Sequence, residues 1–155
     1  MQKRGFAIVI LAIALIVSSV LVAFANDDID RHRTCADCGM DRKAYGFSRM
    51  LILYEDGSQV GVCSLHCAVN ELDANKGRAV KSLLVADRDT RALIAAETAH
   101  WVIGGNRRGV MTKRPKWAFA TKEAARAFIA KSGGELASWD EALAAAREDA
   151  AAKAK

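Results

Sequence analysis

The chain has 155 residues, of which 52% are hydrophobic and 26% are charged, and it contains a single proline. This length suits one domain or two small related units, and the lone Pro115 argues against a disordered, proline-rich tail or linker. The formal net charge of +5 is mild, and the densest basic cluster, around Arg107 and Arg108, has few aromatic neighbours, so no nucleic-acid partner is expected.

The N-terminus carries a targeting signal. Residues 5–25 form an uncharged apolar run behind Lys3 and Arg4. A positive end followed by such a run is typical of a secretion signal, and the small residues before position 26 would allow cleavage after Ala25. About 20 apolar residues are also enough to span a bilayer as a helix. Residues 1–25 are therefore either a cleaved signal peptide or a retained membrane anchor, and we favour the anchor. Both interpretations place the body outside the cytoplasm, in the periplasm or its equivalent.

A polar tether over residues 26–33, without apolar periodicity, leads into the folded part. Apolar and β-branched residues at 48–54 and 59–63 flank an Asp-Gly turn, which predicts a β-hairpin.

The first half continues with a helix. Ser64 is suited to cap a helix that runs toward Gly77, and residues 79–86 predict a further strand. The alanine-rich residues 92–99 favour a short helical turn.

The second half repeats this order of elements. Extended segments, a capped helix, a short strand and a last helix are predicted at residues 101–103, 116–120, 121–133, 135–137 and 138–148. Ser138 and Glu141 form a capping box that opens the last helix, and residues 149–155 are expected to form a frayed tail. The predicted class is α+β, with two small sheet-and-helix units over residues 34–100 and 101–148, preceded by an N-terminal hydrophobic helix.

All four cysteines lie in the first unit, as Cys35-x-x-Cys38 and Cys63-x-x-x-Cys67. Gly39 permits the positive φ that lets backbone N–H groups approach a metal-bound sulfur. The second pair straddles a predicted helix N-terminus, whose partial positive charge favours the metal-binding thiolate. A cysteine knuckle, a hairpin and a second pair at a helix start are typical of a treble-clef metal site.

Softer donors lie close to these thiols in the sequence. Met40 follows the first pair, His66 lies inside the second, and Met111 follows a glycine-rich stretch. Thiolate with thioether suits copper(I), whereas zinc rarely uses methionine, so Met40 shifts the prediction from zinc toward copper. Met50 lies inside a predicted strand and is expected in the core. The candidate metal ligands are Cys35, Cys38, Met40, Cys63, His66, Cys67 and Met111.

Two other interpretations remain open. Four cysteines, or three with His66, would form a structural zinc module for protein contacts. In an oxidising compartment, Cys35–Cys38 and Cys63–Cys67 would instead be the disulfides of a thiol–disulfide protein. The chain has no hydrolase, zinc-protease, P-loop or haem-attachment motif, so no catalytic residue is assigned and no enzyme activity is predicted.

Several segments resemble the nitrous-oxide reductase accessory proteins of the NosL type: CADCGM at 35–40, WVIGG at 101–105, GVM at 109–111, KWAFA at 116–120 and GGELASWDEA at 133–142. The resemblance covers roughly residues 34–146. It implies two similar β-β-α-β units and an exported protein that carries copper(I) for assembly of a copper enzyme. By motif, it places Cys35, Cys38 and Met40 on the family's signature and Met111 on its later methionine, with Cys38 as the first choice of thiolate ligand.

The chain departs from this family in two ways. No cysteine lies directly after the apolar run, and the residues before Cys35 are not a lipidation signal, so the lipid-modified cysteine of many family members is missing. The second cysteine pair is richer in thiols than the family requires, which suggests a heavy-metal-handling branch or a second, structural ion. We expect a metallochaperone, not an enzyme, that passes copper(I) by ligand exchange to a copper-receiving enzyme or copper-transport partner. It would contact the membrane through residues 5–25 if these are not cleaved.

Overall fold

A computed structural model describes residues 27–153. The expected signal peptide or membrane helix, residues 1–25, lies outside the described residues. Among the helices within 27–153, none is both long and apolar enough to cross a membrane.

The fold is mixed α/β with two antiparallel sheets. The first sheet has the strand order β2-β1-β3-β4, and the second has the order β6-β5-β7. The strands are β1 (Met50–Tyr54), β2 (Gln59–Val62), β3 (Val80–Ala86), β4 (Leu93–Ala95), β5 (His100–Ile103), β6 (Lys116–Phe119) and β7 (Glu135–Ala137). Each half therefore contains a hairpin, a helix and a returning strand, in the order expected from the sequence.

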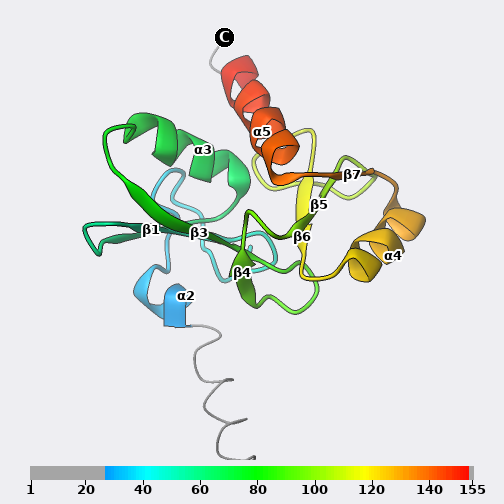
Figure 1. Ribbon diagram of the computed structural model, residues 1–155, viewed down its shortest axis with the longest axis horizontal. Helices are drawn as coiled ribbons and strands as arrows, with labels where there is room; N and C mark the ends of the chain where they lie inside the picture. The colour runs from blue at the N-terminus through cyan, green and yellow to red at the C-terminus, as the bar shows by residue number, and fades with distance from the viewer. Residues whose placement is uncertain (1–26, 154–155) are drawn as a thin grey trace, which may run out of the picture.

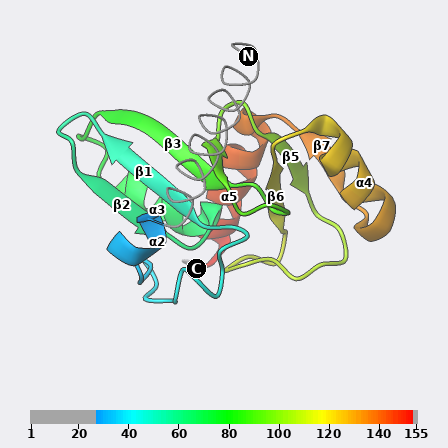
Figure 2. The ribbon, with the colours of Figure 1, turned by 90° about the horizontal axis from the view of Figure 1, so that it is seen from below.

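The helices cover and join the two sheets. They are α2 (Asp27–Arg31), α3 (Leu65–Ala74), α4 (Lys122–Ser132) and α5 (Trp139–Lys153). Figure 1 shows the sheets side by side, with α3 beside the first and α4 at the outer side of the second. Helix α5 packs against both α3 and β5, so it lies between the two halves, as the turned view also shows (Figure 2). The main core contains buried residues of both units, and a smaller, separate cluster around Phe119 and Phe128 lies in the second.

Local sequence signals set the boundaries of the later helices. Thr121 caps α4, because its side chain accepts a hydrogen bond from the Ala124 N–H at 3.2 Å. The capping box at Ser138 and Glu141 is complete. The Ser138 N–H donates to the Glu141 carboxylate at 2.7 Å, and the Glu141 N–H donates to the Ser138 hydroxyl oxygen at 3.3 Å. Each cap satisfies backbone N–H groups that a helix start leaves without a partner.

Three predicted segments differ from the structure. Residues 92–99, expected as a helical turn, contain strand β4, which pairs with β3 from Leu84↔Ala95 to Ala86↔Leu93. Tertiary pairing here outweighs the helical preference of alanine. Helix α3 ends at Ala74, before Gly77. Helix α5 continues to Lys153 through the expected frayed tail, because Asp149 is held by Lys116 and by the Thr112 hydroxyl at 2.6 Å.

The expected polar tether is also structured. Residues Asp27–Arg31 form the short helix α2, in which Asp28 and Ile29 are buried. The residues after α2 pack closely against Gly61 of β2. A Cβ at this position would lie 2.5 Å from the His32 Cβ and 2.7 Å from the Arg42 guanidinium carbon, so only glycine leaves room for them. The segment before the first cysteine is therefore part of the core of the first unit.

A buried ion network fixes α2. Asp28 accepts charge-assisted hydrogen bonds from Arg42 at 2.8 Å and from Arg49 at 2.9 Å, and both arginine side chains are fully buried. Burial alone would raise the pKa of Asp28, but the hydrogen bonds and positive charges of Arg49 and Arg42 outweigh it and hold this pKa below its usual value. The folded state therefore keeps Asp28 ionised.

We expect Asp28→Asn to lower the free energy of unfolding by about 3–5 kcal/mol, because it leaves two buried guanidinium groups without their counter-charge. Urea unfolding of the full chain at pH 7, followed by circular dichroism, measures this change. Since the folded-state pKa of Asp28 lies below the unfolded one, the contribution is complete above about pH 4 and is lost as the pH falls through the folded pKa. The difference between the two proteins should therefore shrink in acid.

The control is Asp30→Asn in the same helix, where the side chain is exposed. This variant should stay within about 0.5 kcal/mol of the unmodified chain. Equal stabilities for the Asp28 and Asp30 variants would contradict the role of the buried network.

Candidate metal centre

The sulfur atoms of Cys35, Cys38, Cys63 and Cys67 all lie within 4.8 Å of one another; we call this group the cysteine quartet. The Cys63 sulfur lies 3.5 Å from that of Cys38 and 3.6 Å from that of Cys67. All four cysteines are free thiols, in place of the disulfides that one interpretation of the sequence expected. Cys38 is partly exposed, whereas the other three are buried.

Local backbone geometry builds the quartet from two distant segments. In the first, the Cys35 N–H donates to the Met40 carbonyl at 2.8 Å, and Gly39 takes the positive φ of +76° that was expected of it. In the second, Cys63 follows β2 directly and Cys67 lies in the first turn of α3. The Cys63 N–H donates to the Cys35 sulfur at 3.3 Å, which is the kind of backbone contact that stabilises a thiolate.

The thiols influence one another's ionisation. Hydrogen bonds from Cys63 and then Cys67 hold the pKa of the Cys35 thiol well below its usual range. The same contacts act in reverse on their partners: the hydrogen bond to Cys35 raises the pKa of Cys63 to about 12, and that of Cys67 is raised as well. Cys35 is therefore the favoured thiolate, and a bound cation would favour the loss of the protons from Cys63 and Cys67.

Arg42 holds the end of the β1–β2 hairpin next to the quartet. Its guanidinium donates to the carbonyls of Met50 at 3.0 Å and Val62 at 3.1 Å, which are paired residues of β1 and β2. Val62 precedes Cys63, so this buried arginine fixes the end of the hairpin from which the second cysteine pair emerges.

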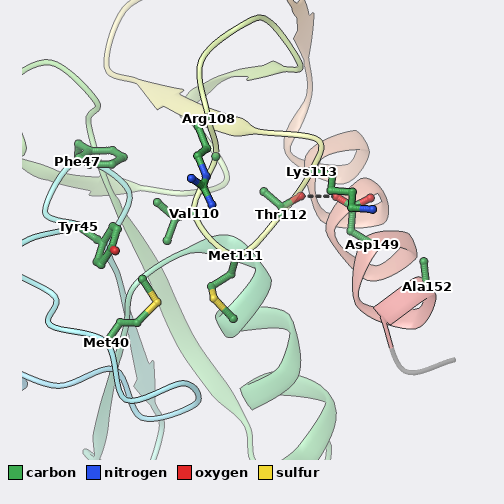
Figure 3. A pocket seen from close by; sticks show the side chains of 11 residues that line it. Met40, Tyr45, Phe47, Arg108, Val110, Met111, Thr112, Lys113, Asp149 and Ala152 are labelled. Atoms are coloured by element: carbon green, nitrogen blue, oxygen red, sulfur yellow. Dashed lines mark hydrogen bonds between the residues drawn. The ribbon is translucent and has the colours of Figure 1, made fainter.

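Met40 and Met111 belong to a different feature, a surface cavity of about 710 Å³. Its apolar lining also includes Tyr45, Phe47 and Val110. Figure 3 shows the two methionine side chains pointing toward one another across the cavity, one from the cysteine knuckle and the other from the loop between β5 and β6. We call this the methionine pocket.

The loop that carries Met111 is strained and firmly held. Met111 has φ of +59°, a left-handed conformation that is uncommon for a residue other than glycine. Thr112 is bonded to Asp149 of α5, and Arg114 donates to the Ala145 carbonyl of the same helix at 3.0 Å. Helix α5 therefore fixes the backbone around Met111, which keeps its thioether directed into the pocket.

The sequence model of the NosL family matches residues 26–146 of the chain. The chain belongs to the NosL family. A search of the curated proteins gives no match.

A solved NosL structure has the same fold. The crystal structure of the copper chaperone NosL from Shewanella denitrificans superimposes with a TM-score of 0.56 and 23% sequence identity, over 70% of this chain and 87% of that one. At this identity the likeness establishes the fold that the NosL resemblance implied, with its two antiparallel sheets and covering helices.

The structure divides the predicted ligands of this NosL-family chain into two groups. The cysteines form the quartet, and the methionines face the pocket. Cys38 does not line the pocket, although it precedes Met40 by two residues. His66 is buried at the start of α3, but its nitrogens are not part of the group of atoms that includes the four sulfurs. Met50, as expected, is a fully buried core residue.

Sequence analysis missed the residues that support these groups. Arg42 and Arg49 belong to no recognisable motif. Only apolar residues around them in the sequence could have indicated that these arginines are buried. Tyr45 and Phe47 line the pocket from a turn that no periodic pattern identifies. The strain at Met111 depends on the contact between its loop and α5, which the sequence does not reveal.

Proposed function

We propose that this NosL-family chain is an exported copper(I) carrier. It holds the ion in the methionine pocket and passes it by ligand exchange to a copper enzyme of the nitrous-oxide-reductase type. Under this proposal copper is cargo, and the protein is a metallochaperone, not an enzyme. The family membership and the fold shared with a protein described as a copper chaperone support this function.

The observation that carries the proposal is the pair of thioethers facing one another in an open cavity. Thioether sulfur is a soft, neutral donor that suits copper(I) better than zinc or other harder ions. Two such donors leave coordination positions free, so a partner's ligand can bind before the methionines let go. The pocket is therefore suited to transfer.

The strained backbone at Met111 agrees with a functional role. A non-glycine residue in the left-handed region costs about 1–3 kcal/mol and persists only where the surrounding structure imposes it. Here the bonds of Thr112 and Arg114 to α5 impose it. The resulting side chain points toward Met40 in the pocket (Figure 3).

Cys38 was the first choice of thiolate for copper, and its position supports a secondary role. It is the partly exposed member of the quartet and lies at the end nearest to Met40 in the chain. We propose that Met40 and Met111 hold the copper, and that Cys38 acts through the knuckle backbone that it shares with Met40 and does not itself bind the cargo. His66 has no place in this copper site.

A second candidate function, a structural zinc module for protein contacts, is favoured by the cysteine quartet alone. That function would not require two methionines to converge on a surface cavity. The quartet and the pocket are therefore assigned different roles.

Replacing both pocket methionines by leucine tests the copper site. We expect Met40→Leu with Met111→Leu to weaken copper(I) binding by the reduced full chain at least tenfold, roughly the loss that even supporting residues of metal sites cause. Leucine keeps the volume and apolar character, so the fold should be retained. Competition with a chromophoric copper(I) chelator under anaerobic conditions measures the affinity.

Met50→Leu is the matched control, because Met50 is fully buried in β1 and does not line the pocket. This variant should bind copper(I) as the unmodified chain does. A double variant that competes as well as the Met50 variant would reject the methionine pocket as the cargo site.

We also propose that the domain lies outside the cytoplasm and is retained at the inner membrane by residues 5–25. The apolar run behind Lys3 and Arg4 supports this location. Alkaline phosphatase fused after Lys155 should be active in a Gram-negative host, since this enzyme folds only after export, and deletion of residues 5–25 should abolish the activity. An inactive but intact fusion of the full chain would contradict export.

A further inference from the structure

We propose that the cysteine quartet is a second metal site, separate from the methionine pocket, which binds one zinc ion and stabilises the first unit. This inference does not depend on the copper proposal, because the two sites have no ligand in common.

The sulfur positions fit a single tetrahedral ion. With zinc–sulfur bonds of about 2.3 Å, the edge of a tetrahedral site is about 3.8 Å. The Cys38–Cys63 and Cys63–Cys67 separations of 3.5 and 3.6 Å lie close to this edge, and the remaining pairs fall within 4.8 Å. A multi-iron cluster would hold its cysteine sulfurs further apart. Four thiolates around one centre are therefore best matched by zinc.

The quartet is a closed site, unlike the pocket. Cys35, Cys63 and Cys67 have at most 2% of their surface exposed, so an ion bound by all four sulfurs has no free position for an incoming ligand. Structural zinc sites have this form, with four protein ligands and no open position. A carrier of copper needs the opposite arrangement.

The quartet also connects the irregular knuckle to the hairpin and to helix α3. One pair of cysteines sits in the irregular knuckle, and the other links the end of β2 to the start of α3. The Arg42 guanidinium holds the end of β2 through the Val62 carbonyl, and its positive charge acts on Cys35. A metal bound here would hold the knuckle on the hairpin, and its binding free energy would add to the stability of the fold.

Such an ion would also help to hold Met40 in place at the pocket. The knuckle from Cys35 to Met40 is closed by the 2.8 Å bond between these two residues. Fixing the sulfurs of Cys35 and Cys38 therefore fixes the backbone that places Met40 at the pocket. Zinc would also occupy thiolates that otherwise attract the copper cargo.

Metal titration of the full chain tests this site. The probes are Zn²⁺ and Co²⁺ alone, added anaerobically to reduced, metal-free protein kept in mild detergent. We expect one equivalent of Zn²⁺ to bind and to raise the melting temperature. Co²⁺ should give the intense visible bands of a tetrahedral ion together with sulfur-to-cobalt charge transfer.

Variants separate this site from the pocket. Cys67→Ala should weaken Zn²⁺ binding at least tenfold, a conservative expectation for a lost ligand, and should still bind copper(I) through Met40 and Met111. The Met40→Leu, Met111→Leu protein should bind Zn²⁺ and Co²⁺ as the unmodified chain does. Copper binding by the methionine variant tests only the proposed function. Zinc binding by the same variant tests only the quartet, so the two proposals can fail separately.

Three results would overturn the inference. The unmodified chain could take up no Zn²⁺ or Co²⁺, or its Co²⁺ complex could lack tetrahedral thiolate bands. The methionine variant could lose zinc as it loses copper, which would make the two sites one. All three results are measured on the unmodified chain and on the Met40→Leu, Met111→Leu variant, so they test the inference even if Cys67→Ala does not fold.

Discussion

The arrangement of the first unit depends on one buried guanidinium group. Arg42 bonds the paired strand residues Met50 and Val62, the backbone of α2, and the carboxylate of Asp28. It lies two residues after the knuckle in the chain, so its burial brings the knuckle against the end of the hairpin. The two cysteine pairs meet there, and Met40, at the end of the knuckle, lines the methionine pocket. A charge in the core is costly without partners, and here the partners come from α2, the residue that follows it, and the paired strands β1 and β2.

The chain carries two kinds of sulfur chemistry on one knuckle. Thiolates are anionic, are favoured by hydrogen bonding and positive charge, and are enclosed; thioethers are neutral and face an open cavity. A tightly closed site holds its ion, whereas a site with few donors releases it to a competing ligand. Cys38 and Met40 are only two residues apart in the sequence, which gave no sign that one belongs to the quartet and the other lines the pocket.

The sequence predicted the elements whose signals are local. The Asp-Gly turn, the caps at Thr121 and Ser138, and the glycine of the knuckle all act within a few residues, and the structure contains each of them. It did not predict what depends on distant contacts. Strand β4 exists because β3 offers it an edge, α2 is ordered because Arg42 and Arg49 reach Asp28, and Met111 is strained because α5 holds its loop. The candidate ligands were found by residue type, but their division into two groups required the fold.

The central claim is that two ions bind in two places. Crystals of the protein loaded with zinc and copper(I), measured at both absorption edges, test this claim directly through anomalous scattering. We predict a zinc peak enclosed by the four cysteine sulfurs and a separate copper peak between Met40 and Met111. A single peak among the cysteines that scatters at the copper edge, with no density between the methionines, would contradict it.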